Sequence, residues 1–221
     1  MTGGELIDVY DDLGRAEGVR DRATVHREGW WHAVFHLLIV ARRADGPVVI
    51  LQRRATSKVA FGGLLDLSAT GHLAAGERPI DGLRELREEL GVDLDPDQTV
   101  PLGVRRVVDD TPEGMNREFC HVHLAIDDRP LDSYRPDPDE VSAVVELAVE
   151  DALDLFAGRC PSVVVRELPV GGSVTDRVVA PGDFVPEPGL GDVPGGGRPS
   201  YWTTLMVMAS RLAAGDRRLA I

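Results

Sequence analysis

Apolar side chains gather in short runs along the first half of the chain. Residues 33–40 (AVFHLLIV) are almost continuously apolar over the length of a buried strand, and residues 48–52 form a second such run. The turn-forming residues Asp45, Gly46 and Pro47 stand between the two runs. The pattern therefore predicts two buried strands that pair with each other.

A different periodicity begins at Pro79. Leu83, Leu86 and Leu90 recur at helical intervals, Pro79 suits the first turn of a helix, and Gly91 is typical just beyond the last turn. The spacing predicts a helix over residues 79–90 that buries one stripe of leucines. We expect three segments before this helix, namely a glycine-bearing loop at 61–66, a short strand at 67–73 and a second loop at 74–78.

The second half of the chain alternates between strand-like and helix-like patterns. Strands are predicted at residues 102–108, 118–126 and 141–149, and helices at 150–157 and 201–214. Such an alternation around a single core indicates an α/β or α+β sandwich. We expect three parts in the chain: a main domain at 1–180, a loop or lid rich in proline and glycine at 181–200, and a C-terminal helix within 201–221 that packs on the same domain.

Composition narrows the possible partners. The chain has 221 residues, 43% of them apolar, and a formal net charge of −13. This charge opposes binding to a nucleic acid polymer, whereas a phosphate group bridged by a metal ion is compatible with it. The sequence has neither a signal-peptide pattern nor an apolar run long enough for a membrane span, which predicts a cytoplasmic protein with no membrane partner. Cys120 and Cys160 lack metal-ligand spacing and are expected to be free thiols without a catalytic role.

Three carboxylates share one face of the predicted helix. Glu85, Glu88 and Glu89 stand at positions i, i+3 and i+4, where side chains are neighbours. Their repulsion costs a few tenths of a kcal/mol per pair on an exposed helix. A divalent cation converts that repulsion into binding, because Mg²⁺ prefers hard oxygen ligands. The spacing alone leaves two interpretations, a metal site or an ordinary solvated face.

Residues 71–92 (GHLAAGERPIDGLRELREELGV) contain a longer pattern. From Arg84 to the end of this segment, the residues match the second half of the Nudix box without a mismatch, and Gly71 and Glu77 match its first half. The chain thus resembles the Nudix hydrolases. The stretch between Glu77 and Arg84 is one residue shorter than the family pattern, and we assign the missing residue to the loop or first helical turn around 78–82. This difference leaves the role of Glu77 open.

The resemblance implies a fold and a chemistry. The fold is an α/β/α sandwich with a mixed central sheet, and the reaction is hydrolysis of a diphosphate linkage in a small nucleoside-diphosphate-type or related substrate. Glu88 and Glu89 are then expected to bind Mg²⁺ or Mn²⁺, with Glu85 as a further ligand or as the base that acts on water. Arg84 is expected to orient Glu85 through a charge-assisted hydrogen bond. The cation in such chemistry neutralises phosphate oxygens and lowers the pKa of bound water.

Other residues enter through the same resemblance. Glu118 is expected to project from a strand towards the acidic helix and complete the metal shell. Arg54 and Lys58, the only lysine in the chain, are expected to steady the terminal phosphate of the substrate. A homodimer is the default expectation for the oligomeric state.

Segments outside the box are similar to the Nudix branch near isopentenyl-diphosphate isomerase. The metal-binding positions of that isomerase correspond here to His26, His32, His72 and Glu118. These histidines can equally be residues that fix strand ends and turns. Asn116 replaces a second glutamate of the isomerase, and Thr70 stands where it has a catalytic cysteine. Hydrolysis is therefore the main prediction, with two alternatives: an isomerase that releases no phosphate, and a module that binds nucleotides without turning them over.

Overall fold

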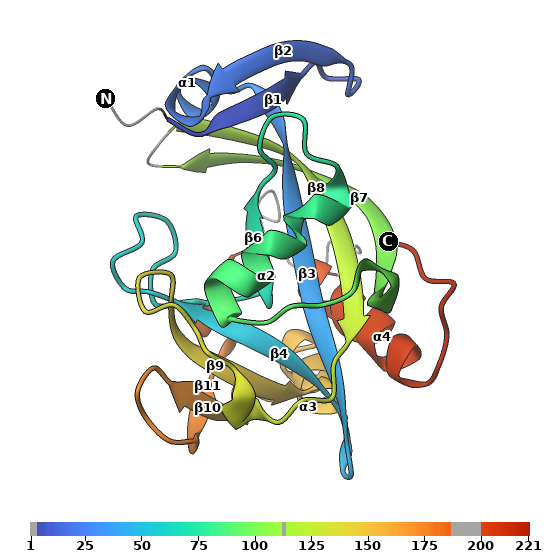
Figure 1. The fold of residues 1–221 in the computed structure, drawn as a ribbon. Coiled ribbons are helices and arrows are strands. Elements are labelled where there is room, and N and C mark those ends of the chain that lie inside the picture. Colours follow the sequence, from blue (N-terminus) through green and yellow to red (C-terminus); the bar gives the residue numbers. More distant parts are fainter. Residues whose placement is uncertain (1–3, 112–113, 187–199) are drawn as a thin grey trace.

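The computed structural model describes residues 4–111, 114–186 and 200–221 (Figure 1). The strands are β1 Leu6–Tyr10, β2 Ala16–Asp21, β3 Trp31–Arg43, β4 Gly46–Arg54, β5 Leu65–Asp66, β6 Ala69–His72, β7 Thr99–Thr111, β8 Gly114–Ile126, β9 Val141–Ala148, β10 Val163–Pro169 and β11 Thr175–Val179. The α-helices are α1 Arg22–Glu28, α2 Leu83–Leu90, α3 Val149–Phe156 and α4 Tyr201–Ala213. Short 3-10 turns lie at Pro79–Gly82, Pro96–Gln98, Leu131–Ser133 and Pro181–Asp183.

One mixed sheet runs through the molecule, and β3 is its central strand. The main path of the sheet is β11-β10-β9-β4-β3-β1-β2, and β8 and β7 extend it from the other edge of β3. β3 and β8 run parallel, whereas the other paired strands of the described chain are antiparallel. The mixed α+β architecture predicted from the sequence is confirmed.

Strand β3 is apolar because helices cover the sheet on both faces. Leu38 and Val40 belong to a core that includes α3 and α4. Leu37 and Ile39 point to the opposite face and pack in a second core with Leu86 of α2. The sandwich therefore has α2 on one side of the sheet and the two later helices on the other (Figure 1).

Several strands share one edge of β3. β8 occupies the other edge along residues 31–40 of β3. The shared edge is divided among β1 at residues 31–32, β6 at 34–37 and β4 at 39–43. The sheet consequently opens where β6 gives way to β4, and α2 packs against β3, β6 and β9. This opening brings the acidic face of α2 next to a cavity.

The helix expected over residues 79–90 has a different beginning in the structure. Pro79–Gly82 forms a 3-10 turn, and α2 starts at Leu83. The backbone N–H of Arg78 donates to Asp81 at 2.8 Å, which closes this turn. The helix ends as expected, with Gly91 in the left-handed conformation at φ 67°. The irregular turn lies at the place to which we assigned the missing residue of the Nudix box.

The strands predicted around β3, β4, β6, β7, β8 and β9 are all present, and so are the helices α3 and α4. The hairpin β1–β2, the helix α1 and the strands β10 and β11 were not predicted. Most of the loop expected at 181–200 lies outside the described residues, and the division of the chain at 180 and 200 stays a prediction. Among the described helices, none has the length and apolar character of a membrane span.

Candidate functional site

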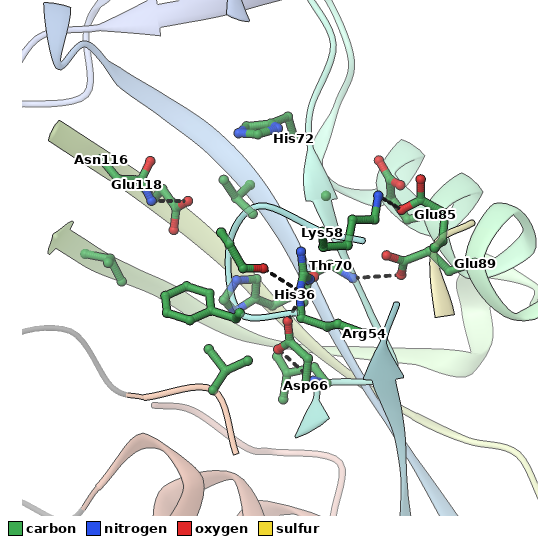
Figure 2. Close-up of a pocket in the computed structure, with 18 of the residues that line it drawn as sticks. His36, Arg54, Lys58, Asp66, Thr70, His72, Glu85, Glu89, Asn116 and Glu118 are labelled. Atoms are coloured by element: carbon green, nitrogen blue, oxygen red, sulfur yellow. Dashed lines mark hydrogen bonds and ion pairs between the residues drawn. The ribbon is translucent and has the colours of Figure 1, made fainter. Parts of the chain in front are cut away.

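A cavity of about 650 Å³ lies beside the acidic helix (Figure 2). Its wall is formed by β3, β6, β7 and β8, by the acidic face of α2, by the loop after β4, and by the beginning of α4. The predicted site residues Arg54, Lys58, Arg84 and Glu118 all line it, together with Glu85, Glu88 and Glu89 of the helix. The fold therefore brings every one of these residues to a single cavity.

Arg84 holds the first of the three carboxylates. Its Nη1 donates to Glu85 Oε1 at 2.5 Å, and its Nη2 donates to the backbone carbonyl of His72 at 2.8 Å. Glu77 accepts from Arg84 Nε at 2.8 Å. Glu85 also lies against Gly71, where an added Cβ would stand 2.1 Å from Glu85 Oε1. The glycine and the acid of the first half of the box thus serve to place Arg84 and Glu85.

Glu89 is the most enclosed of the three carboxylates, with 5% of its surface exposed. Gln52 Nε2 of β4 donates to Glu89 Oε2 at 3.0 Å, and the backbone N–H of Thr70 donates to the same oxygen at 3.2 Å. Glu88 is half-exposed and lies 3.3 Å from Arg84 Nη1. Both hydrogen bonds end on Oε2 of Glu89, and neither donor reaches its Oε1.

Burial raises the pKa of two of these carboxyl groups. Desolvation raises the pKa of Glu85 to about 7, although the Arg84 guanidinium opposes that shift. Desolvation likewise raises the pKa of Glu89 well above its ordinary value, and the charge of Glu85 adds to the effect. Negative charge on this wall is therefore incompletely compensated by the protein. A hard divalent cation is the kind of ligand that such a set of oxygens favours.

Arg54 and Lys58 face the same cavity, and both are paired with acids. Arg54 Nη1 lies 3.1 Å from Asp66 Oδ2, and it lines the cavity close to the loop after β4. Lys58, on that loop, forms an ion pair with Glu140. Figure 2 shows Arg54 and Lys58 in the middle of the view, with Glu85 and Glu89 to one side and Glu118 to the other. A phosphate group would compete with these carboxylates for the two cations.

Glu118 does not lie with the carboxylates of the helix. It projects from β8, accepts from Asn116 Nδ2 at 2.6 Å, and accepts from Cys120 Sγ at 3.4 Å. Figure 2 shows it on the wall of the cavity opposite Glu85 and Glu89. The reason is topological, because β8 pairs with the edge of β3 that is remote from β6 and α2. Its expected approach to the acidic helix is therefore not what the structure shows, and a role in metal binding stays a prediction.

Three imidazole rings meet near one end of the cavity. His26 comes from α1, His32 from β3 and His72 from β6, and one nitrogen of each lies within 4.8 Å of the others. Burial lowers the pKa of His32 and of His72, which keeps both rings neutral at physiological pH. His32 Nε2 is buried and has no hydrogen-bond partner among the described residues. Neutral imidazoles at this separation are able to share one cation.

Sequence reasoning missed a second group on the cavity wall. His36 Nδ1 lies 2.9 Å from the Tyr201 hydroxyl, and the Arg105 guanidinium sits 4.2 Å from the centre of the Tyr201 ring. These residues come from β3, α4 and β7. Gln52 was missed in the same way, because nothing in its neighbourhood in the sequence points to Glu89. Contacts of this kind join distant segments and leave no local pattern.

Comparisons with known proteins agree with this architecture. The Nudix domain model matches residues 32–166. The chain is 29% identical to an uncharacterized Nudix hydrolase from Clostridium acetobutylicum, over 82% of this chain and 90% of that protein. It is also 36% identical to an isopentenyl-diphosphate Delta-isomerase from Cutibacterium acnes, over 68% of this chain and 77% of that protein. The crystal structure of DR0079 from Deinococcus radiodurans superposes with a TM-score of 0.53 at 24% identity, covering 70% and 90% of the two chains, which shows a common fold.

The match to the Nudix domain and the likeness to relatives named Nudix hydrolase support a hydrolase that acts on pyrophosphate bonds. The chain belongs to the Nudix family, because the family model covers more than half of its length. Enzymes of this family generally require a divalent metal and act on small diphosphate compounds.

Proposed function

We propose that the protein hydrolyses a diphosphate linkage in a small nucleoside-diphosphate-type or related substrate, with water activated by Mg²⁺ or Mn²⁺ bound to carboxylates. The observation that carries the proposal is the set of three glutamates on α2 beside the cavity, two of them with raised pKa values. The negative charges of these carboxylates are close together and only partly compensated by the protein. A hard divalent cation relieves their repulsion by binding the oxygens.

The residues of the chain divide the work of this reaction. Glu88 and Glu89 supply oxygen ligands, and Gln52 and the backbone of Thr70 hold Glu89 in place. Glu85 acts as a further ligand or accepts the proton of the attacking water, and its pKa of about 7 suits a base that works near neutral pH.

Substrate binding falls to other groups. Arg84 positions Glu85 and does not touch the substrate, since Glu77, Glu85 and the backbone of His72 occupy its N–H groups. Arg54 and Lys58 bind the terminal phosphate in exchange for their present carboxylate partners. Mg²⁺ or Mn²⁺ at such a site neutralises phosphate oxygens and lowers the pKa of water.

The cytoplasmic location and the homodimer stay predictions. Light scattering of the purified protein tests the homodimer.

The test is release of phosphate or pyrophosphate from a panel of nucleoside di- and triphosphates, nucleotide sugars, dinucleotide cofactors and isopentenyl diphosphate. Wild type is compared with Glu89→Gln in Mg²⁺ and in Mn²⁺. We expect turnover of at least one compound and a loss of ~10²-fold or more in the variant, the range for removal of an essential acid–base or ligand group. Glu150→Gln, an exposed glutamate on α3, is the control and is expected to behave as wild type. A panel without any turnover contradicts the proposal.

The imidazole cluster favours one other candidate, an isomerase of the isopentenyl-diphosphate type. His26, His32 and His72 lie close enough to share a cation at this end of the cavity. Against this candidate, Thr70 stands where the resembling isomerase has the thiol that works on an allylic carbon. Incubation with isopentenyl diphosphate separates the two functions, because an isomerase forms a new allylic diphosphate without release of phosphate.

A further inference from the structure

Arg105 is a cation on the cavity wall that forms no ion pair with a carboxylate of the described residues. It projects from β7, it is half-buried, and it forms no ion pair with any residue in the described ranges 4–111, 114–186 and 200–221. Two acids line the same wall. Glu118 accepts hydrogen bonds from Asn116 and Cys120, and the charge of Arg105 acts to lower its pKa without an ion pair between the two. Asp109 forms no ion pair with Arg105 within those ranges. Arg22, Arg54, Lys58 and Arg84 also line the cavity, and the last three form ion pairs with acids.

The guanidinium of Arg105 is fixed in place. It lies over the ring of Tyr201 with its centre 4.2 Å from the ring centroid, and the Tyr201 hydroxyl is held by His36 at 2.9 Å. Burial, with help from the charge of Arg105, lowers the pKa of His36 to about 3, so this ring is neutral and contributes no competing charge. A stacked guanidinium keeps its in-plane N–H groups free to bind a carboxylate or phosphate in a two-point manner.

Arg105 is well separated from the acidic helix. The strand register places Arg105, Cys120, Val34 and His72 in one row across β7, β8, β3 and β6. Three strand spacings of about 4.8 Å put the backbones of Arg105 and His72 about 14 Å apart. His72 adjoins Gly71, against which Glu85 packs. Arg105 therefore lies on the strand of this row that is farthest from the acidic helix.

We propose that Arg105, supported by Tyr201 and His36, binds a second anionic group of the substrate, a phosphate or carboxylate carried on the organic part beyond the diphosphate that is cleaved. This inference rests on the proposed hydrolase function, which places the diphosphate at α2. It names the substrate class as diphosphate compounds whose leaving portion or nucleoside portion bears its own anion.

Matched pairs of substrates test the inference. NADPH and NADH, and coenzyme A and its 3′-dephospho form, differ by one phosphate, whereas UDP-glucuronate and UDP-glucose differ by a carboxylate. We expect kcat/KM to favour the anion-bearing member of at least one pair by roughly 10- to 100-fold, the range for hydrogen bonds to a charged group. The pair that responds tells whether the group is a phosphate or a carboxylate. Arg105→Gln is expected to abolish the preference, mainly by raising the KM of the anion-bearing member.

Arg106→Gln is the matched control. Arg106 is the next residue on β7, it points to the opposite face, and its guanidinium lies 4.6 Å from the centre of the Trp31 ring. Loss of a stacked arginine affects both variants, but only Arg105→Gln is expected to remove the preference. A purely structural role for Arg105 in fastening α4 would change the melting temperature and leave the ratio within each pair unchanged.

The possible results separate the two proposals. Wild type without a preference in any pair, or a preference that survives Arg105→Gln, overturns the second-anion site and leaves the hydrolase intact. If no compound is hydrolysed, the proposed function fails, and the same pairs are compared by calorimetric binding. A binding preference that Arg105→Gln removes supports the site even then, whereas equal or undetectable binding within every pair overturns it.

Discussion

Replacing Glu85 by glutamine is expected to stabilise the protein in EDTA at pH 8. The Glu85 side chain is only 14% exposed, and burial raises its pKa from 4.5 to about 7. Ionisation of this carboxylate therefore destabilises the folded state. A pKa difference of about 2.5 corresponds to about 3 kcal/mol, at about 1.4 kcal/mol for each pH unit. The pKa of about 7 already includes the attraction of Arg84, so we expect a gain of about 3 kcal/mol in the free energy of unfolding.

The sign of the effect depends on pH. Between pH 4.5 and about 7, folded Glu85 keeps its proton while the unfolded chain has released it. The unfolded state then binds fewer protons, so the stability of wild type falls as pH rises through this window. Glutamine does not titrate. The advantage of the variant is therefore expected to be near its maximum above pH 7, to shrink as pH falls from 7 to 4.5, and to be absent below pH 4.5.

Urea denaturation of wild type and Glu85→Gln at pH 5, 6, 7 and 8 in EDTA measures this difference directly. Glu88→Gln is the matched control, because its carboxylate is half-exposed on the same helix, and we expect a change below about 0.5 kcal/mol. Equal stability of wild type and Glu85→Gln at pH 8 would refute the reasoning. Added Mg²⁺ is expected to stabilise wild type and to narrow the gap, because an ion that binds only the folded state shifts the equilibrium by mass action.

Three further variants test the supports of the site. Gln52→Met removes the hydrogen bond to Glu89, and we expect the Mg²⁺ concentration for half-maximal stabilisation to rise ~10- to 100-fold, with no such rise if Gln52 is a passive core residue. Gly71→Ala places a methyl group within 2.1 Å of a carboxylate oxygen and is expected to reduce kcat at least ~10-fold, while Gly182→Ala, with nothing within 4 Å, leaves the rate unchanged. Leu86→Ala is expected to lower the free energy of unfolding by ~2 to 5 kcal/mol, since Leu86 is fully buried; a loss below 1 kcal/mol contradicts its place in the core.

The fold was predictable where side-chain periodicity and burial coincide. Strand β3 and helix α2 both bury apolar stripes of the expected period, and both were found close to their predicted positions. β2 and β11 are mostly exposed, so they carry no alternation that a sequence could display. The prediction of an α-helical first turn was wrong. Proline at the first position and an acidic residue in the first turn are compatible with a 3-10 turn as well as with an α-helical turn, so Pro79 did not distinguish them.

The candidate site was predictable only in its contiguous part. Glu85, Glu88 and Glu89 lie on one helix, and their spacing is visible in the sequence. The contact of His36 with Tyr201 joins residues 165 positions apart. No local pattern encodes such a contact, since it depends on how α4 returns to the sheet. The same holds for Glu118. Its position on the cavity wall depends on which edge of β3 pairs with β8, and this pairing is not visible in the local sequence.

Strand β3 pairs with several other strands, so a change in its length disturbs the structure more than a change in the turn before α2. One inserted or deleted residue in β3 would reverse the faces of every side chain beyond it, sending His36 into the core beneath α2 and Leu37 into the cavity. The segment 78–82 is not constrained in this way, because it forms a turn whose length can change without altering which residues of α2 face the core. The chain can therefore be one residue shorter than the Nudix pattern immediately before the acidic helix, whereas a change of one residue within β3 would disrupt both cores.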